Sequence, residues 1–185
     1  KLADQADKIS MQLTKTLLIT GPAGSGKTHL YEYLKSHGVP AADTDEIPGL
    51  GRWVDDVGIE VQYPANADKA WLAAHHYVWS PEVLRTYIRS HAPVVLLGLS
   101  HDDAAQFRDF FDRIVYLKVP ADVLQERLAY RNNIHGKTEE QRKSVLSYLA
   151  DFDSKAERSG YLVVDASKLP VEIWQDILVG INAQK

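Results

Sequence analysis

Short apolar runs of strand length alternate along the chain with longer segments in which apolar residues recur at helical spacing. The predicted strands are 16–20, 39–42, 94–98, 113–119 and 161–165. Helices are predicted at 29–36, 67–79, 81–90, 102–111, 121–131, 138–159 and 171–181, and the glycine- and proline-rich stretch 47–66 is expected to be irregular. This alternation is typical of an α/β protein, and we expect five parallel strands with helices on both faces of the sheet.

Composition and length indicate one ordinary globular domain. The chain has 185 residues, of which 45% are hydrophobic and 25% charged, values typical of globular proteins. We place the domain at residues 11–185, a length sufficient to bury a sizeable core. Residues 1–10 are mostly polar and precede Met11, the single methionine, so we expect a leader or a disordered tail, with a native N-terminal helix as the alternative.

Charge and residue usage exclude several classes of partner. A formal net charge of −4 argues against a nucleic-acid-binding surface. No apolar run approaches the roughly 20 residues of a membrane span, and no signal peptide is recognisable. The chain has no cysteine, so disulfides, thiol catalysis and cysteine zinc sites are excluded. These features favour a cytoplasmic protein with a small-molecule partner and leave its oligomeric state open.

One motif carries the strongest chemical prediction. Residues 21–28 match G-x-x-x-x-G-K-[ST] and lie between a predicted strand and a predicted helix. Glycines let backbone N–H groups turn toward phosphate oxygens, and the helix N-terminus adds positive charge. Lys27 is expected to reach the β- and γ-phosphates, and the Thr28 hydroxyl to ligate Mg²⁺. The motif predicts a nucleoside triphosphate site, with ATP as the default, formed by Gly21, Pro22, Ala23, Gly24, Ser25, Gly26, Lys27 and Thr28.

Several classes of protein share such a loop. A GTPase would show an N-K-x-D motif after a later strand, and none is present. Motor, transporter and AAA ATPases usually end a buried strand with an acidic residue that serves Mg²⁺ and water activation. The comparable strand here ends in Gly98-Leu99-Ser100, and the chain is short for those classes, so we expect none of them.

The order of features resembles the small P-loop kinases of the nucleoside-monophosphate-kinase and shikimate-kinase-like group, from Met11 onward. The loop, Asp43-Thr44-Asp45, Arg127 with Arg131, and Val164-Asp165-Ala166-Ser167 carry the resemblance. It implies a P-loop NTPase three-layer sandwich with an acceptor-covering segment at about 47–91 and a small lid at about 127–140.

By this resemblance, Asp43 lies near the Mg²⁺ shell, and Asp45 orients or deprotonates the acceptor hydroxyl. Both follow a predicted parallel strand, at the sheet edge where α/β proteins bind ligands, and alternation puts them on one side. Glu46 is an alternative base. A turn rich in aspartate and threonine is the alternative without a catalytic role.

Arg127 and Arg131 are one helical turn apart and share a face. Phosphoryl transfer requires cationic groups opposite the loop, because its transition state is highly charged. We expect both arginines to contact phosphate and Arg131 to act in catalysis, with the polar stretch 132–137 forming a lid. The alternative is that both are solvated helix charges.

The acceptor is less well defined. The Gly-Gly-Gly turn of shikimate kinases is reduced to Gly98, and Arg52 is the nearest candidate for a substrate-binding arginine. Aromatic residues within 53–79 suit a planar or sugar-like ligand or form ordinary core. We therefore expect transfer of the γ-phosphate of Mg-ATP to a small-molecule hydroxyl, with Asp45, Arg52 and Gly98 as acceptor contacts. The alternatives are a nucleoside monophosphate kinase and a nucleotide-binding regulatory protein with slow ATP hydrolysis.

Overall fold

The computed structural model describes residues 13–64, 67, 69–98, 106–130 and 139–183. Its main sheet has five strands in the order β2-β6-β1-β7-β8, and every pairing is parallel. These strands are β1 Leu17–Thr20, β2 Ala41–Asp43, β6 Val95–Leu97, β7 Arg113–Lys118 and β8 Leu162–Asp165. The five predicted strands are confirmed, with ends that differ by at most two residues.

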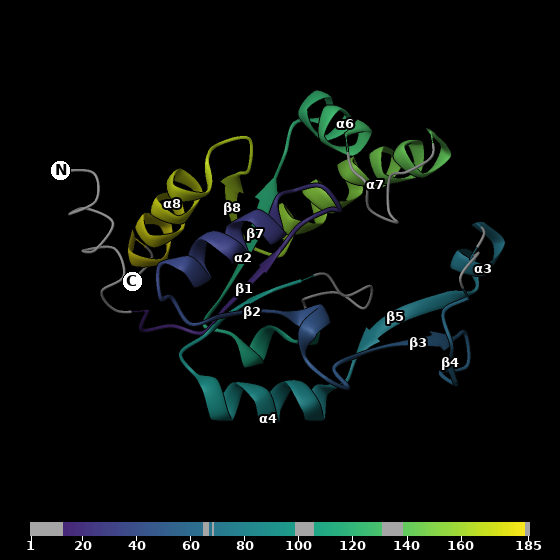
Figure 1. Ribbon diagram of the computed structural model, residues 1–185, viewed down its shortest axis with the longest axis horizontal. Helices are drawn as coiled ribbons and strands as arrows, with labels where there is room; N and C mark the ends of the chain where they lie inside the picture. Colours follow the sequence, from purple (N-terminus) through teal and green to yellow (C-terminus); the bar gives the residue numbers. More distant parts are fainter. Residues whose placement is uncertain (1–12, 65–66, 68, 99–105, 131–138, 184–185) are drawn as a thin grey trace.

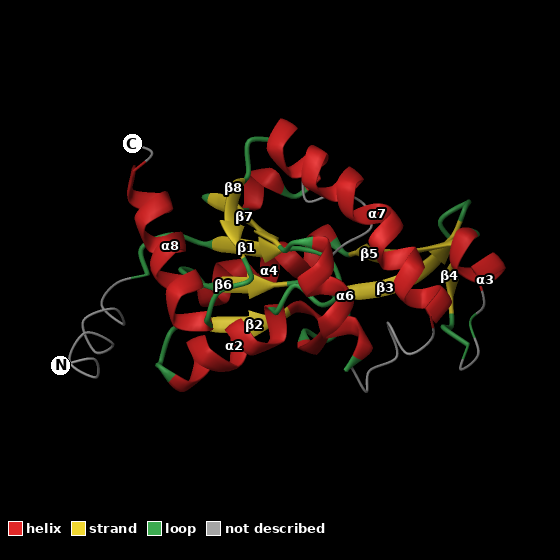
Figure 2. Ribbon diagram, turned by 90° about the horizontal axis from the view of Figure 1, so that it is seen from above, coloured by secondary structure: helices red, strands yellow, loops and turns green. Residues whose placement is uncertain are grey.

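Helices cover both faces of this sheet (Figures 1 and 2). They are α2 Lys27–Ser36, α4 Pro81–His91, α6 Ala121–Ala129, α7 Glu139–Arg158 and α8 Pro170–Ala183, with short helices η1 Thr44–Glu46, α3 Lys69–Ala73 and η2 Arg108–Phe110. Ser80 begins α4 as the sequence signal suggests, since its hydroxyl accepts a hydrogen bond from the Val83 N–H. The predicted α/β architecture is therefore confirmed.

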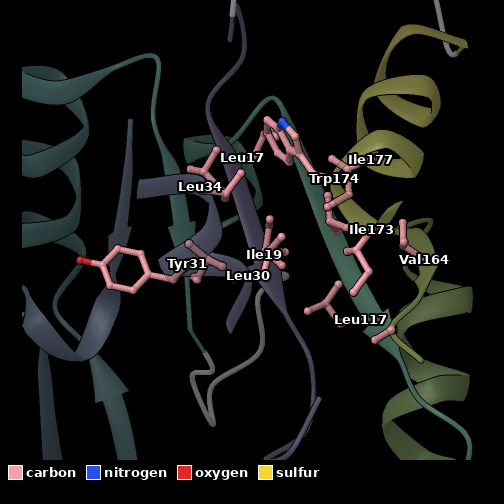
Figure 3. Packing of buried hydrophobic residues seen from close by; sticks show 14 of the residues in the cluster. Leu17, Ile19, Leu30, Tyr31, Leu34, Leu117, Val164, Ile173, Trp174 and Ile177 are labelled. Atoms are coloured by element: carbon pink, nitrogen blue, oxygen red, sulfur yellow. The ribbon is translucent and has the colours of Figure 1, made fainter. Parts of the chain in front are cut away.

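Alternate residues of β1 supply two hydrophobic cores on opposite faces of the sheet. Leu17 and Ile19 belong to the first core, which α2 and α8 cover, and Leu18 belongs to the second, which α4 covers. Figure 3 shows side chains of the first core, where Ile173, Trp174 and Ile177 of α8 face the strands. A central parallel strand is buried on both sides, which explains its continuous apolar sequence.

A second, antiparallel sheet has the order β4-β3-β5. Its strands are β3 Gly51–Asp55, β4 Glu60–Val61 and β5 His75–Trp79, and with α3 they project from one end of the molecule (Figures 1 and 2). We call these three strands the small sheet. Ile47, Leu50 and Trp79 anchor its base in the second core.

The small sheet corrects two expectations. Within the stretch expected to be irregular, residues 51–55 and 60–61 form strands joined by a tight hairpin turn. In this turn Asp55 Oδ1 accepts hydrogen bonds from Val57 N and Ile59 N, and Gly58 has a φ of +85°. Residues 67–79 are not one helix, because the aromatic and β-branched run at 75–79 favours a strand. Of the helix expected at 102–111, residues 102–105 lie outside the described residues, and 108–110 form η2.

The first core gives a stability test on α8. Ile177 is 0% exposed and Val179 is 70% exposed. We expect Ile177→Ala to lower the free energy of unfolding by about 2–5 kcal/mol, because it leaves a cavity beneath the helix. Val179→Ala should change it by less than about 0.5 kcal/mol. Urea unfolding of both variants measures the difference, and equal effects would contradict the placement of α8.

Candidate active site

The loop between β1 and α2 is shaped by glycines. Gly24 has a φ of +89°, and a Cβ at that position would lie 2.7 Å from Leu124 Cδ1 of α6. Gly26, with a φ of +96°, is the N-cap of α2. Residues with side chains rarely adopt such backbone angles. The loop thus follows the surface of α6, and the N-terminus of α2, which has no acidic residue in its first turn, opens toward it.

Lys27 folds its side chain back over this loop. Its Nζ donates hydrogen bonds to the carbonyl oxygens of Gly21 at 2.7 Å and Pro22 at 3.0 Å, with the Ser25 hydroxyl at 3.5 Å. Ser25 is fully buried, and its N–H donates to the Pro22 carbonyl. Lys27 therefore places its charge at the loop, and Thr28 lies exposed in the first turn of α2.

Asp43 ends β2 and caps η1, since its Oδ1 accepts a hydrogen bond from Asp45 N at 3.0 Å. Burial raises the pKa of the Asp43 carboxyl, and the hydrogen bond from Asp45 and the charge of Lys27 act in the opposite direction. The influence of Lys27 shows that this carboxyl and the loop lysine lie near one another. Asp45 lies in η1 and not in an extended strand, so the strand alternation from which a shared side was predicted for Asp43 and Asp45 does not apply.

The structure separates the two candidate bases. Glu46 Oε2 accepts a hydrogen bond from the Tyr31 hydroxyl of α2 at 2.9 Å, and Lys35 Nζ donates to that hydroxyl at 3.3 Å. Asp45, by contrast, is exposed, and its Oδ1 accepts a hydrogen bond from the Tyr77 hydroxyl of β5 at 3.2 Å. Glu46 thus ties η1 to α2, and Asp45 is the carboxylate that faces the small sheet.

Gly98 has a packing explanation. It follows β6, it is buried, and its N–H donates to the Ile19 carbonyl. A Cβ at this position would overlap the Thr44 hydroxyl. Thr44 is 1% exposed, and its Oγ1 has no hydrogen-bond partner among the described residues. Gly98 thus makes room for the threonine between the two aspartates.

Arg127 of α6 points to the loop from the other side. Its Nη1 lies 3.8 Å from the position that a Cβ of Gly26 would occupy. This nitrogen is buried and has no hydrogen-bond partner among the described residues. Buried polar atoms are usually hydrogen-bonded, and a phosphate oxygen in the loop is a group that would satisfy this nitrogen. Arg131 and the other residues of 131–138, which form most of the lid expected at about 127–140, lie outside the described residues.

Arg52 is not brought to Asp45. It alternates with Trp53 along β3, and Trp53 pairs with Tyr77 in the register of the small sheet. Neighbouring residues of a strand point to opposite faces. The exposed Arg52 side chain therefore lies on the face opposite the tyrosine that bonds to Asp45.

None of the residues that line one cavity belongs to the glycine loop. Its volume is about 680 Å³, and it is lined by Lys118, Val119, Pro120, Ala121, Leu146, Leu149, Ala150, Asp153, Val163 and Asp165. No local sequence pattern predicts this cavity, because its walls come from four elements that are separate in the chain. Asp165, in the wall of this cavity, accepts two hydrogen bonds from Ser167, and these are the main cause that lowers its pKa. The charge of Arg127 lowers the pKa of Asp165 further, so the two side chains lie within electrostatic range of each other.

The residues at the loop fit a magnesium-bound nucleoside triphosphate. Glycines leave room for phosphate oxygens, and Lys27 and the unpartnered Arg127 nitrogen supply positive charge. Among the described residues, no cluster of three or more His, Asp or Glu side chains forms a metal cage. Mg²⁺ on a nucleotide needs only one or two protein ligands, and the Thr28 hydroxyl and the Asp43 carboxylate are of the right chemistry.

The family comparison agrees with this geometry. A family model described as an AAA domain matches residues 17–146, well over half of the chain. The chain belongs to that family. The sequence expectation against AAA ATPases rested on the missing acidic residue after Gly98 and on the short chain; the family match gives the class of domain, and the expectation about ATPase activity stays a prediction. No curated protein sequence gave a significant match.

Solved structures similar to this AAA domain are those of small kinases. Shikimate kinase from Acinetobacter baumannii aligns with a TM-score of 0.61 at 19% identity, covering 97% of this chain and 98% of that chain. A gluconokinase from Sinorhizobium meliloti 1021 gives 0.54 at 20% identity, covering 93% and 94%. Deoxyadenosine kinase from M. mycoides gives 0.53 at 16% identity, covering 92% and 100%. The fold is that of the small P-loop kinases, which confirms the resemblance. None of the described helices is both long enough and apolar enough to span a membrane.

Asp43 gives a pH-dependent prediction. Burial raises the pKa of Asp43 in the folded state, so folding favours the protonated carboxyl. The stability that this gives is fully present below the unfolded-state pKa and is lost as the pH rises through the folded-state pKa. At pH 7 the buried charge destabilises the fold. We expect Asp43→Asn to unfold at higher urea concentration than the unmodified protein at pH 7, with a much smaller gap near pH 4.

Asp151→Asn is the matched control, because Asp151 is exposed on α7. A stability gap for Asp43→Asn that stays the same at both pH values would contradict burial of the carboxylate as its cause.

Proposed function

We propose that this chain is an ATP-dependent phosphotransferase that moves the γ-phosphate of Mg-ATP to a hydroxyl of a small molecule. The observation that carries the proposal is Nη1 of Arg127, which is buried beside the glycine loop and has no hydrogen-bond partner among the described residues. A buried cationic nitrogen without a partner is costly, and a phosphate oxygen would satisfy it. The fold shared with small kinases supports the same conclusion.

In the proposed reaction, the acceptor oxygen attacks the γ-phosphorus. The bond from this phosphorus to the oxygen that bridges it to the β-phosphate breaks, ADP leaves with the electron pair, and the acceptor proton passes to Asp45. Lys27 and Arg127, with Arg131 as the resemblance implies, neutralise charge in a loose transition state. Mg²⁺, held by Thr28 and Asp43, would supply further charge neutralisation.

A hydroxyl acceptor is favoured over a phosphate. An acceptor phosphate would need arginines beside Asp45, and Arg52 lies on the opposite face of the small sheet.

We propose that residues 11–185 form a single domain, in which 47–91 cover the acceptor and 127–140 form the lid. We also propose that the protein is located in the cytoplasm. The partners are then Mg-ATP and the small-molecule acceptor.

The deciding experiment measures ADP release from Mg-ATP with a panel of acceptors. Shikimate, gluconate and deoxyadenosine come first because of the structural neighbours, followed by sugars, other nucleosides and nucleoside monophosphates. Stimulation by a hydroxyl compound supports the proposal, and stimulation by monophosphates alone favours a nucleotide kinase. Tight ATP binding without stimulation by any compound favours a regulatory protein.

Lys27→Ala tests the loop. We expect acceptor-dependent turnover to fall about 100-fold or more, because a preorganised cation next to the transferred group is lost. Lys143→Ala is the control: Lys143 is exposed on α7 and pairs with Glu139 at 2.8 Å, and its removal should leave turnover unchanged. Normal binding and turnover of ATP by Lys27→Ala would show that the loop is not the active site.

Arg127→Ala tests the unpartnered nitrogen. Hydrogen bonds to charged groups contribute about 1.5–3 kcal/mol, so the Kd of Mg-ATP should rise about 10- to 100-fold. Arg89→Ala, which removes an exposed arginine from α4, should leave the Kd unchanged. Titration with a fluorescent ATP analogue measures both, and an unchanged Kd for Arg127→Ala would remove Arg127 from the site.

A further inference from the structure

The Tyr77 hydroxyl joins the small sheet to the end of β2. It donates a hydrogen bond to Asp45 Oδ1 at 3.2 Å, across 32 residues of sequence. The Tyr77 ring is held by Trp53, the residue opposite it on β3, at a centroid distance of 5.6 Å. Trp53 in turn packs against Trp71 and Tyr63, each at 5.1 Å. We call these four rings the aromatic cluster.

A glycine leaves the space that this hydrogen bond requires. Gly51 lies diagonally from Tyr77 in the register of β3 and β5. A Cβ at position 51 would overlap the Tyr77 hydroxyl and the ring carbon that carries it. The backbone of Gly51 is not in the left-handed region, so a conformational requirement does not explain the glycine. Its absent side chain lets the tyrosine lean across β3 toward Asp45.

The hydroxyl is a permanent donor at working pH. Burial, followed by the charge of Asp45, raises the pKa of Tyr77 to about 12. A tyrosine that stays protonated donates its single O–H and cannot itself act as the base.

Resting on the proposed function, we propose that Tyr77 is a positioning residue that fixes the Asp45 carboxylate for the acceptor hydroxyl. With Oδ1 held by Tyr77, the second carboxylate oxygen is the one that takes the acceptor proton. Orientation of this kind governs the rate, because reacting atoms displaced by an ångström can lower it by about two orders of magnitude. The other three rings of the aromatic cluster act by holding the Tyr77 ring in place.

The test compares Tyr77→Phe with Tyr148→Phe. Tyr148 lies on α7 and is 55% exposed, so Tyr148→Phe removes a tyrosine hydroxyl away from Asp45 and from the aromatic cluster. With Mg-ATP and the acceptor that gives most turnover in the panel, Tyr77→Phe should lower kcat about tenfold. Its KM for ATP should stay near that of the unmodified protein, and Tyr148→Phe should change neither constant.

Coupling to Asp45 separates positioning from simple folding effects. In an Asp45→Asn background, Tyr77→Phe should cause little further loss of kcat, because the group that it positions is already disabled. Gly51→Ala should lower kcat as Tyr77→Phe does, since its methyl group displaces the ring. Urea unfolding of Tyr77→Phe, Asp45→Asn and the double variant should likewise show less than additive losses.

Each outcome bears on one of the two proposals. If Asp45→Asn abolishes turnover but Tyr77→Phe behaves like Tyr148→Phe, or if the two losses multiply, the positioning role is overturned and the proposed function stands. If no compound in the panel supports turnover, or if Asp45→Asn keeps full turnover, the proposed reaction fails and the positioning role with it.

Discussion

Strand β1 is hydrogen-bonded on both edges, to β6 and β7, and buried on both faces. Each of its apolar residues therefore serves one of the two cores, Leu17 and Ile19 on one side and Leu18 on the other. Because the strand cannot shift without emptying both cores, its carboxyl end is fixed in space. The glycine loop begins directly at that end, so the position of Lys27 depends on the packing of β1 more than on any contact within the loop.

This dependence explains why half of the site could be predicted from sequence. The burial of β1, the glycine loop and the start of α2 are local consequences of residues 16–28, and the structure agrees with each. The small sheet could not be predicted in the same way. Its glycines and its Asp55 turn read as irregular chain when each is taken alone, and only the pairing of β3 with β5 gives them a strand context.

The aspartates at the end of β2 show the same limit at the level of side chains. Their place after a predicted strand puts Asp43 and Asp45 at the ligand-binding edge of the sheet, with Glu46 as an alternative base, but it does not distinguish the three carboxylates. Their hydrogen-bond partners distinguish them. Asp43 caps η1, whereas Glu46 accepts a hydrogen bond from a tyrosine of α2 and Asp45 accepts one from a tyrosine of β5. These contacts depend on how distant elements pack, and no local pattern records them. Arg52 shows the converse, since strand register turns a plausible arginine away from the site.

Glycines are required in the candidate site for two different physical reasons. Gly24 adopts a backbone angle that side chains disfavour, and its motif predicts that need. Gly98 and Gly51 have no such angle; each is bare because another residue occupies the place of its Cβ, Thr44 in one case and Tyr77 in the other. Both of these side chains adjoin Asp45: Thr44 precedes it in sequence, and Tyr77 donates a hydrogen bond to its carboxylate. Under the proposed function, most of the phosphate-donor side comes from one continuous loop, joined by Arg127 and Asp43. The proposed acceptor side depends on close packing between separate elements, so its specificity can change without disturbing the loop.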